Sequence, residues 1–441
     1  MSAASVAPEM AAGAGASGDA ALSEGRLVRL RAAAAEAGAG AFLVRDTSNI
    51  RWACAFDGVF DDEPAHALYV CPQHAWLHTD SRYAGACEAA AAGGPVQVSV
   101  EKGSHAAFAA RRWAQRPAAA AGARLGIEDA IALAEYRALQ RAFAAEAAAE
   151  GAVVPAGGAA GERCEGAANR AVAPAGGAGA CEAPGATAGA AGAVADASGG
   201  PFVETTDVVL RLRAVKDGDE LARMAAAQAI TDAAFAHIVG LMAPGMTERE
   251  VQLALDDFML KHGAEGLAFP SIVATGPNGA NPHAIPGDTV LEAGQCVVMD
   301  FGARARGYCS DMTRTVFLGR PEGEMLRAWE VLREANEAVE AFVRPGVMGR
   351  ECHELAEKVL ADGGFGGRMG HGLGHGVGLD VHELPTLNPR NDQPLQAGNV
   401  VTVEPGIYLP GRFGMRLEDC GVVTERGYEP FGRASHEMVV I

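Results

Sequence analysis

Residues 297–316 read VVMDFGARARGYCSDMTRTV, and this stretch decides the fold of the second half of the chain. Two β-branched, apolar runs flank a short loop, a pattern that predicts a β-hairpin. If the turn centres between Ala305 and Arg306, Asp300 lies directly opposite Asp311. Cross-strand partners have Cβ atoms about 4.5–5.5 Å apart, and like charges at that distance are destabilising. Two facing aspartates in an apolar hairpin therefore imply a shared proton, a bound cation or a different register, and a divalent metal is the strongest remedy.

A second hairpin is predicted about 100 residues further on, where residues 400–423 read VVTVEPGIYLPGRFGMRLEDCGVV. A loop centred near Gly411 puts Glu404 roughly opposite Glu418. Arg416 lies two residues before Glu418 and so shares its face of the strand. Two facing acid pairs hold about four negative charges, which buried carboxylates tolerate only with compensation. Two divalent cations would provide it.

The helical patterns before the two hairpins also repeat. Residues 244–250 read PGMTERE and residues 345–351 read PGVMGRE, an offset of 345 − 244 = 101. Thr247 and Glu250 form a capping box, which marks a helix start. The predicted helices cover 219–242, 247–263, 324–343 and a fourth that ends near residue 363. One helix-helix-sheet unit is therefore used twice, and we expect the site where the two halves meet.

Histidines cluster beside glycines between the two hairpins. Residues 370–378 read GHGLGHGVG, and His371 and His375 share a face if this segment is extended. The glycines let the backbone approach a ligand closely. His382 follows, and His283 lies upstream in the sequence Asn-Pro-His-Ala. These four imidazoles, together with the acid pairs, form the candidate site.

The first half of the chain has a different organisation. Residues 1–23 are rich in Ala, Gly and Ser and read as a disordered tail. A helical pattern at 26–37, strand-like runs at 41–44, 67–71 and 75–78, and a helical stretch at 127–149 predict an α/β domain. Residues 151–200 are mostly Ala and Gly without aromatic residues, which predicts a tolerated flexible insert. We therefore divide the chain into a tail (1–23), an N-terminal domain (24–205) that includes this insert, and a catalytic domain (206–441).

Composition excludes several classes of protein. The 441 residues carry 36 Lys and Arg against 55 Asp and Glu, a net charge of −19. Such an acidic chain is a poor partner for nucleic acid or an anionic membrane, and no apolar run approaches the roughly 20 residues of a bilayer span. The nine cysteines are scattered singly. They predict neither a disulfide framework nor a zinc ribbon, so we expect the reducing cytoplasm.

Residues 206–441 resemble the prolidase and aminopeptidase P branch of the M24 "pita-bread" metallopeptidases. The resemblance rests on the strings DFGARARGYCSDMTRT, GHGLGHGVGLDVHELP, VEPGIY and GMRLED, in that order. The strings NIRW (49–52) and TDSRY (79–83) are similar, more weakly, to the creatinase-like N-terminal domain of that family. The resemblance implies an α/β (α+β) chain, with a creatinase-like domain followed by a pseudo-twofold catalytic domain. The Ala/Gly insert departs from the family's usual pattern.

The resemblance also implies roles for individual residues. The five metal-ligand positions are matched by Asp300, Asp311, His375, Glu404 and Glu418, with Asp311 and Glu418 bridging two metals. Four carboxylates and one imidazole form a hard site that favours Mn²⁺ over Co²⁺ or Zn²⁺. The substrate-contacting positions are matched by His283, His371, His382 and Arg416. Glu404 is the candidate for proton transfer, together with His283 and His382 as catalytic groups.

The implied activity is hydrolysis of the bond before proline in short peptides, by a homodimer. Cleavage of Xaa-Pro dipeptides and of longer Xaa-Pro peptides are both open at this point. Another small-molecule amide hydrolase or lyase on the same fold is an alternative, since fold does not fix function. A non-catalytic binding module is a third class, although such relatives typically lose ligands and all five are present here.

Overall fold

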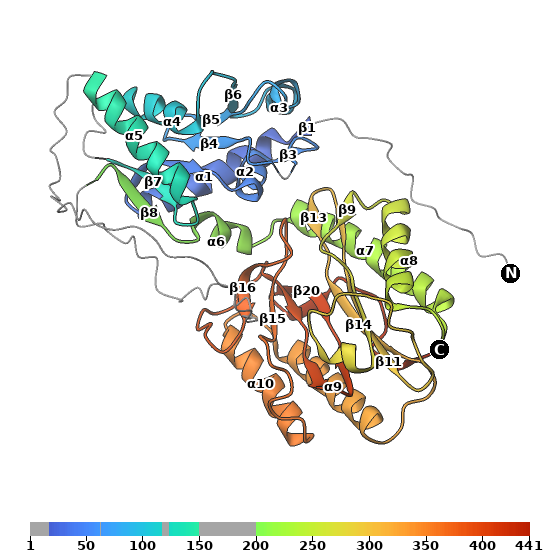
Figure 1. Ribbon diagram of the computed structural model, residues 1–441. Coiled ribbons are helices and arrows are strands. Elements are labelled where there is room, and N and C mark those ends of the chain that lie inside the picture. Colours follow the sequence, from blue (N-terminus) through green and yellow to red (C-terminus); the bar gives the residue numbers. More distant parts are fainter. Residues whose placement is uncertain (1–16, 62, 117–122, 150–199) are drawn as a thin grey trace, which may run out of the picture.

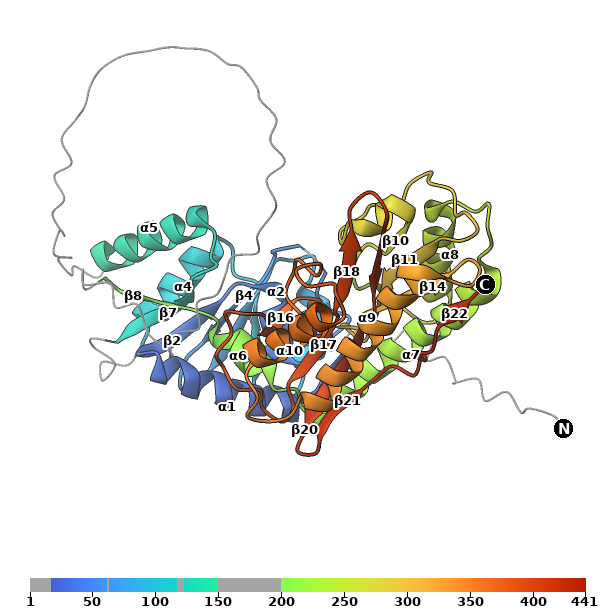
Figure 2. The same ribbon diagram turned by 90° about the horizontal axis from the view of Figure 1, so that it is seen from below.

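The computed structural model describes residues 17–61, 63–116, 123–149 and 200–441 (Figure 1). The expected tail up to residue 16 and the Ala/Gly insert at 151–199 lie outside the described residues. Two bodies are visible, an N-terminal domain and a larger C-terminal half, and helix α6 (Val208–Ala214) lies between them (Figures 1 and 2). The α/β fold class with two domains is thus confirmed.

The N-terminal domain is built on a six-stranded sheet of order β6-β5-β4-β2-β7-β8. Strand β4 is antiparallel to both neighbours, and the other adjacent pairs are parallel. The strands are β2 (Ala39–Val44), β4 (Ala67–Val70), β5 (Ala75–His78), β6 (Val96–Ser99), β7 (Arg124–Glu128) and β8 (Phe202–Thr205). The helices are α1 (Ala20–Glu36), α2 (Thr47–Cys54), α3 (Ala84–Ala91), α4 (His105–Ala114) and α5 (Leu133–Ala149), and a short ladder joins β1 (Ser17–Gly18) to β3 (Phe56–Asp57).

Two sequence expectations for this domain need correction. Helix α1 begins at Ala20, because the Asp19 side chain caps it by accepting from the N–H groups of Ala21 and Leu22. Residues 20–23 therefore belong to the helix and not to a tail. The helix expected at 127–149 starts only at Leu133, because residues up to Glu128 pair with β8 in the sheet.

The C-terminal half contains the helix pair twice, as the repeat predicts. The helices are α7 (Gly218–Leu241), α8 (Glu248–Lys261), α9 (Gly323–Phe342) and α10 (Gly349–Asp362). The capping box of Thr247 and Glu250 is present. At the equivalent place, Glu351 accepts a hydrogen bond of 2.8 Å from the backbone N–H of Met348. The four helix boundaries agree with the predicted ones within a few residues.

Each helix pair packs on its own sheet. The first sheet has the order β10-β11-β14-β22 and the second β16-β15-β17-β20-β21, with the smaller ladders β13-β12-β9 and β18-β19 beside them. Helices α7 and α8 share an apolar cluster with the first sheet, and α9 and α10 share one with the second. The strands are β9 (Gly266–Leu267), β10 (Ile272–Thr275), β11 (Cys296–Phe301), β12 (Ala303–Ala305), β13 (Tyr308–Cys309), β14 (Met312–Phe317), β15 (Gly374–Gly376), β16 (Glu383–Leu387), β17 (Val400–Val403), β18 (Gly406–Leu409), β19 (Phe413–Arg416), β20 (Asp419–Thr424), β21 (Gly427–Pro430) and β22 (Val439–Val440).

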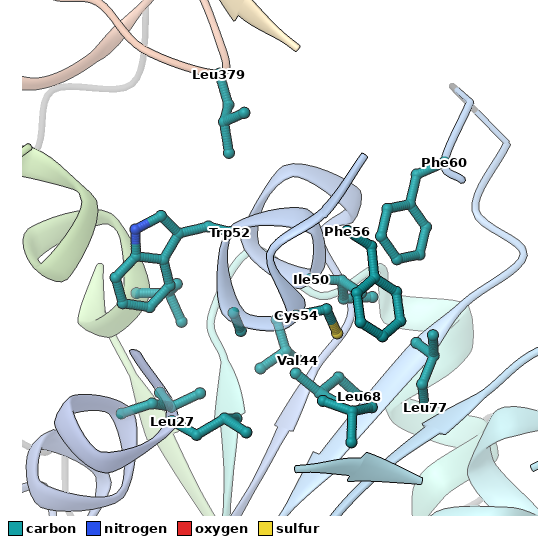
Figure 3. Packing of buried hydrophobic residues seen from close by; sticks show 14 of the residues in the cluster. Leu27, Val44, Ile50, Trp52, Cys54, Phe56, Phe60, Leu68, Leu77 and Leu379 are labelled. Carbon is teal, nitrogen blue, oxygen red and sulfur yellow. The ribbon is translucent and has the colours of Figure 1, made fainter. Parts of the chain in front are cut away.

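A third apolar cluster crosses the boundary between the two domains. It contains Trp52 and Ile50 from α2 together with Tyr308 and Leu379 from the C-terminal half. Figure 3 shows Leu379 pointing toward the helix that carries Trp52. The domains are therefore held together by a shared core and not only by the chain that links them.

The register of the first hairpin differs from the expected one by two residues, because the turn centre lies one position further along the chain. Asp300 pairs with Thr313, and Ala305 pairs with Tyr308. The turn thus consists of Arg306 and Gly307, both with positive φ (51° and 81°), as a type I′ turn requires. Asp300 is therefore diagonal to Asp311 and not opposite it. The two acids still share a face, because Asp311 lies two residues before Thr313.

The register of the second hairpin is the predicted one. Val403 pairs with Asp419 on one side of the acid pair, and Gly406 pairs with Arg416 on the other. Both ladders have the same register, so Glu404 falls in line with Glu418 between them. This places the turn at Gly411, whose φ is +75°.

The expectation that no apolar run is long enough to cross a membrane is wrong for α7. Among the described helices, this one reaches a mean hydropathy of 1.3 over 18 residues because it is rich in Ala. In the fold it packs against β12 and β13. It also buries Glu220 and Thr231, which are hydrogen-bonded to Tyr308 and Ser310. Such internal polar contacts are typical of a core helix.

Candidate metal centre

The five predicted metal ligands come from five separate segments of the C-terminal half. Asp300 lies near the end of β11 and Asp311 directly before β14. His375 is the middle residue of β15, and Glu404 and Glu418 lie in the gap between the two ladders of the second hairpin. The first sheet and the second sheet thus both contribute, as the repeat predicts.

Three of these residues form a compact group. The ligand atoms of Asp311, His375 and Glu418 all lie within 4.8 Å of one another. His375 Nε2 is 3.7 Å from Asp311 Oδ2 and 3.3 Å from Glu404 Oε1, which brings the fourth residue to the same imidazole. Asp300 is connected through Arg416, which donates to its Oδ2. The structure therefore brings all five residues to one place.

The electrostatics of this group indicate a missing positive charge. Burial and the neighbouring acids Glu418, Asp300 and Glu404 raise the pKa of Asp311 well above its usual value. Burial and the same kind of repulsion raise the pKa of Glu418 in the same way. Oδ1 of Asp300 is buried and has no hydrogen-bond partner in the described part of the chain. The group fits hard divalent cations, because it offers several carboxylate oxygens of like charge, one of them without a hydrogen-bond partner.

His375 and Glu404 behave as an ion pair in the protein alone. Burial lowers the pKa of His375, but its contact with Glu404 and the nearby Glu418 outweighs burial and raises the pKa to about 9. Burial opposes ionisation of Glu404, and His375 nevertheless lowers its pKa to about 2. A proton on His375 thus partly compensates the acids here, whereas a metal ligand must be the neutral imidazole.

The three histidines predicted to contact substrate surround this group. His371 Nε2 is 3.1 Å from the Tyr408 hydroxyl. The exposed ring of His382 stands edge-on to His375, with ring centroids 4.3 Å apart. Although part of the side chain is open to solvent, the protein atoms around the ring desolvate it; this desolvation, and then the charge of His375, lower the pKa of His382 to about 4, so it is neutral near pH 7. His283 is exposed, and it is among the groups that lower the pKa values of His371 and His382.

Arg416 is more occupied than its sequence position suggests. Its guanidinium donates to Thr313 Oγ1 (2.9 Å), to the Tyr408 hydroxyl (2.9 Å) and to Asp300. A longer contact of 3.5 Å reaches the carbonyl of Pro282. Arg416 therefore orients Asp300 as well as facing the site, and its role toward substrate stays a prediction.

Sequence reasoning missed several supporting residues. Thr402 Oγ1 donates to Glu404 Oε1 (3.2 Å) and accepts from the His375 backbone N–H (3.0 Å). Thr313 donates to Glu418 Oε2 (2.6 Å). Both threonines lie two residues from a predicted ligand, so period-2 alternation could have identified them. Nothing in the local sequence marks Asn336 of α9, which donates to the carbonyls of Val403 (3.0 Å) and Leu417 (3.3 Å).

A second group, Glu340, Asp419 and His436, also has ligand atoms within 4.8 Å of one another. Asp419 is already paired with Arg314 at 2.8 Å and hydrogen-bonded to His436 at 2.6 Å. Asp419, the first residue of β20, directly follows Glu418 in the sequence, Glu340 lies on α9, and His436 lies between β21 and β22. Arg314 and His436 thus compensate Asp419, whereas Oε1 of Glu340 is buried without a hydrogen-bond partner in the described part of the chain.

Two protein-family models match the chain. Metallopeptidase family M24 matches residues 222–425, and the creatinase/prolidase N-terminal domain matches residues 26–159. The chain is 37% identical over 240 residues to an uncharacterised peptidase of Bacillus subtilis (strain 168), covering 54% of this chain and 68% of that one. It is 36% identical over 239 residues to an Xaa-Pro dipeptidase of Lactobacillus delbrueckii subsp. lactis, covering 54% and 65%.

Solved structures agree over nearly the whole chain. An Xaa-Pro dipeptidase from Bacillus anthracis has a TM-score of 0.76 at 29% identity and covers 95% of this chain and 100% of that one. An X-Pro aminopeptidase from Thermotoga maritima MSB8 has a TM-score of 0.70 at 29% identity and covers 93% and 100%.

Proposed function

Because the chain belongs to metallopeptidase family M24, we propose that it hydrolyses the peptide bond preceding proline in short peptides. The observation that carries the proposal is the buried group of four carboxylates and His375. These residues come from both halves of the repeat, and Arg416 and a proton on His375 compensate the four carboxylates only in part. The similarity of the chain to Xaa-Pro dipeptidases and to an X-Pro aminopeptidase supports Xaa-Pro peptides as the substrate class.

Two divalent cations, which we propose to be Mn²⁺, would be held by Asp300, Asp311, His375, Glu404 and Glu418. When bound, they would supply a water of lowered pKa and polarise the scissile carbonyl. The donor set of hard oxygens supports Mn²⁺, and Co²⁺ or Zn²⁺ would also fit it. Thr402 and Thr313 fix the orientation of Glu404 and Glu418 through their hydroxyls.

The protein groups around the ligands are candidates for proton transfer, for stabilising the developing charge and for binding the substrate. Glu404 is the candidate to carry a proton to the leaving nitrogen, because it is ionised and lies against His375. Neutral His382 can donate a hydrogen bond to the charge that develops on the carbonyl oxygen. His371 and His283 line the same space as substrate contacts. These roles are assigned by position in the matched motifs and by proximity.

Selection of proline must rest on shape and on the group that follows it. The bond before proline is a tertiary amide without an N–H to recognise. Arg416 is the candidate to bind a free proline carboxylate by a charge-assisted hydrogen bond. Dipeptides and longer peptides differ in the position of that carboxylate.

Kinetic assays on matched peptides test the proposal. The Mn²⁺-loaded protein should cleave Leu-Pro or Leu-Pro-Gly and should leave Leu-Ala largely intact. The ratio of kcat/KM for the first two substrates decides between dipeptidase and aminopeptidase. Asp311→Asn should lose both metal and activity, whereas Asp256→Asn, which alters a carboxylate bonded to Ser271 outside the site, should keep both. Equal cleavage of Leu-Ala, or full activity in an exhaustively chelated sample, would contradict the proposal.

We also propose that the protein is a homodimer and that it is located in the cytoplasm. The seven described cysteines are free thiols, which supports a reducing compartment. Light scattering of the purified protein measures the oligomeric state, and fractionation of the source cells measures the location.

A further inference from the structure

We propose that a buried ion network centred on Arg213 positions His382, so that the N-terminal domain contributes to turnover through this histidine. The inference rests on the proposed function, because it assigns a supporting element to one of the groups expected to act on the carbonyl. None of the residues of this network is a predicted metal ligand.

Arg213 lies on α6, between the two domains, and is almost completely buried. Its guanidinium donates to Asn49 Oδ1 on α2 of the N-terminal domain, at 2.6 Å. It also donates to Asp380 Oδ2 at 2.7 Å and to Glu383. One side chain thus bridges positions 164 and 170 residues away from it in the sequence.

Two further contacts complete the network. Lys216 Nζ donates to Glu383 Oε2 at 3.1 Å, and both of these side chains are only 1% exposed. Ser48 of α2 donates to Asp380 Oδ1 at 2.7 Å. Two cations therefore contact the two anions Asp380 and Glu383, and Asp46 Oδ1 of the N-terminal domain lies 3.8 Å from Arg213 Nη1. The N-terminal domain also supplies the Ser48 hydroxyl as a donor and Asn49 Oδ1 as an acceptor. Arg213, Lys216 and Glu383 are buried and need this compensation, whereas the Asp380 side chain is 44% exposed.

The two anions of the network bracket His382 in the sequence. Asp380 and Glu383 are also tied to each other, because the Asp380 N–H donates to Glu383 Oε1 at 3.0 Å. On the upstream side, the carbonyl of Gly378 accepts from the Cys309 N–H at 2.8 Å. The turn at residues 378–383 is tight, since a Cβ at Gly378 would lie 2.6 Å from Glu383 Oε2.

His382 itself has little else to hold it. In the described part of the chain its ring makes the edge contact with His375, and no hydrogen bond of that ring is found. Its side chain is exposed, so packing does not fix it either. The position of the ring is therefore set by the backbone between Asp380 and Glu383. A catalytic group misplaced by about 1 Å can lose about 100-fold in rate.

A double-mutant cycle separates positioning from a merely structural role. Glu383→Gln keeps the shape of the side chain and removes its charge. We expect kcat on the best Xaa-Pro substrate to fall about 10-fold or more, with KM and metal content nearly unchanged. In a His382→Ala background, the same substitution should have almost no further effect on kcat. An equal loss in both backgrounds would overturn the proposal.

Two more variants extend this test: one weakens the network less than Glu383→Gln does, and the other is a matched control outside the network. Ser48→Ala removes one hydrogen bond to Asp380 from the N-terminal domain and is expected to lower kcat in the same direction, by less. Asp57→Asn breaks a different interdomain ion pair, to Arg223 at 2.5 Å, and should leave kcat unchanged. If Asp57→Asn lowers kcat as much as Glu383→Gln, general domain docking explains the effect and the proposal fails.

A spectroscopic measurement makes the inference independent of the substrate. The ring signals of His382 in a ¹H–¹³C NMR spectrum are identified by their loss in His382→Ala. They should move in Ser48→Ala and Glu383→Gln and stay in place in Asp57→Asn. If these signals shift in the network variants but the parent protein cleaves no Xaa-Pro peptide, the proposed function is refuted and the positioning of His382 by the network still holds. Unmoved signals in both network variants would overturn the positioning.

Discussion

At the residue scale, the acids of the site are defined as much by their neighbours as by their own type. Asp300 is oriented by Arg416, Glu404 by Thr402 and His375, and Glu418 by Thr313. Residue type and alternation predict which side chains share a face. The partner of each oxygen depends on segments far apart in the chain.

The raised pKa of His375 predicts how the metal-free protein responds to pH. Its pKa lies at about 9 in the folded protein against 6.5 normally, so the folded state binds the proton more tightly than the unfolded state. This stabilisation is complete below pH 6.5 and is lost as pH rises to 9, at most about 3 kcal/mol. Denaturant unfolding of the chelated protein across this range measures the slope.

The raised pKa values of Asp311 and Glu418 also make the unfolding free energy fall as pH rises, because the folded state binds these protons more tightly than the unfolded state. A His375→Asn variant should show a weaker decline in unfolding free energy over pH 6.5–9. Saturation with Mn²⁺ should remove the decline, because a ligand imidazole is already neutral. Rising stability of the metal-free protein across this range would contradict the assignment.

At the element scale, each long helix sends a polar side chain into the hairpin beside it. Thr231 of α7 accepts from the Ala303 N–H at 3.1 Å and contacts Ser310 Oγ at 2.8 Å. Asn336 of α9 donates to the carbonyls of Val403 and Leu417. In both halves, these contacts satisfy backbone groups where the regular ladder breaks next to the acids. The repeat therefore extends to the support of the hairpins.

Removing the Asn336 amide should weaken the second hairpin. Asn336→Ala leaves two buried carbonyls without this donor, which should cost about 1–3 kcal/mol of unfolding free energy. Metal affinity should fall too, because Glu404 and Glu418 adjoin these carbonyls. Glu334→Ala, on the exposed face of the same helix, is the control. Equal stability and metal affinity in the two variants would show that the hairpin holds without Asn336.

At the scale of the whole molecule, the candidate metal centre joins the two halves of the repeat. Asp300 and Asp311 belong to the first sheet, and the other three predicted ligands to the second. The core that includes Trp52 and Leu379 then attaches the N-terminal domain. Ligands drawn from both halves make metal binding and folding thermodynamically linked.

Metal should therefore stabilise the chain as a whole. A free Mn²⁺ concentration 100 times the dissociation constant adds about 2.7 kcal/mol per site to the unfolding free energy. Chelation should lower Tm, and Mn²⁺ should restore it. Asp311→Asn should show little response to Mn²⁺, whereas Asp256→Asn should respond as the parent protein does. A Tm that changes neither with chelator nor with added Mn²⁺ would argue against a metal site that spans both halves.

The sequence by itself determined the repeated helix pairs, the two acid-bearing hairpins and the face that their acids share. These features depend on local periodicity, capping and turn composition, which act over a few residues. It missed the turn at Arg306 and Gly307 by one position, because Arg at positive φ is uncommon and only the paired strands reveal it. The contacts of Arg416 with Asp300, of Asn336 with the hairpin and of Arg213 with Glu383 were decided by tertiary structure alone. Each joins segments 67 to 170 residues apart, and such contacts arise from packing, which no local pattern encodes.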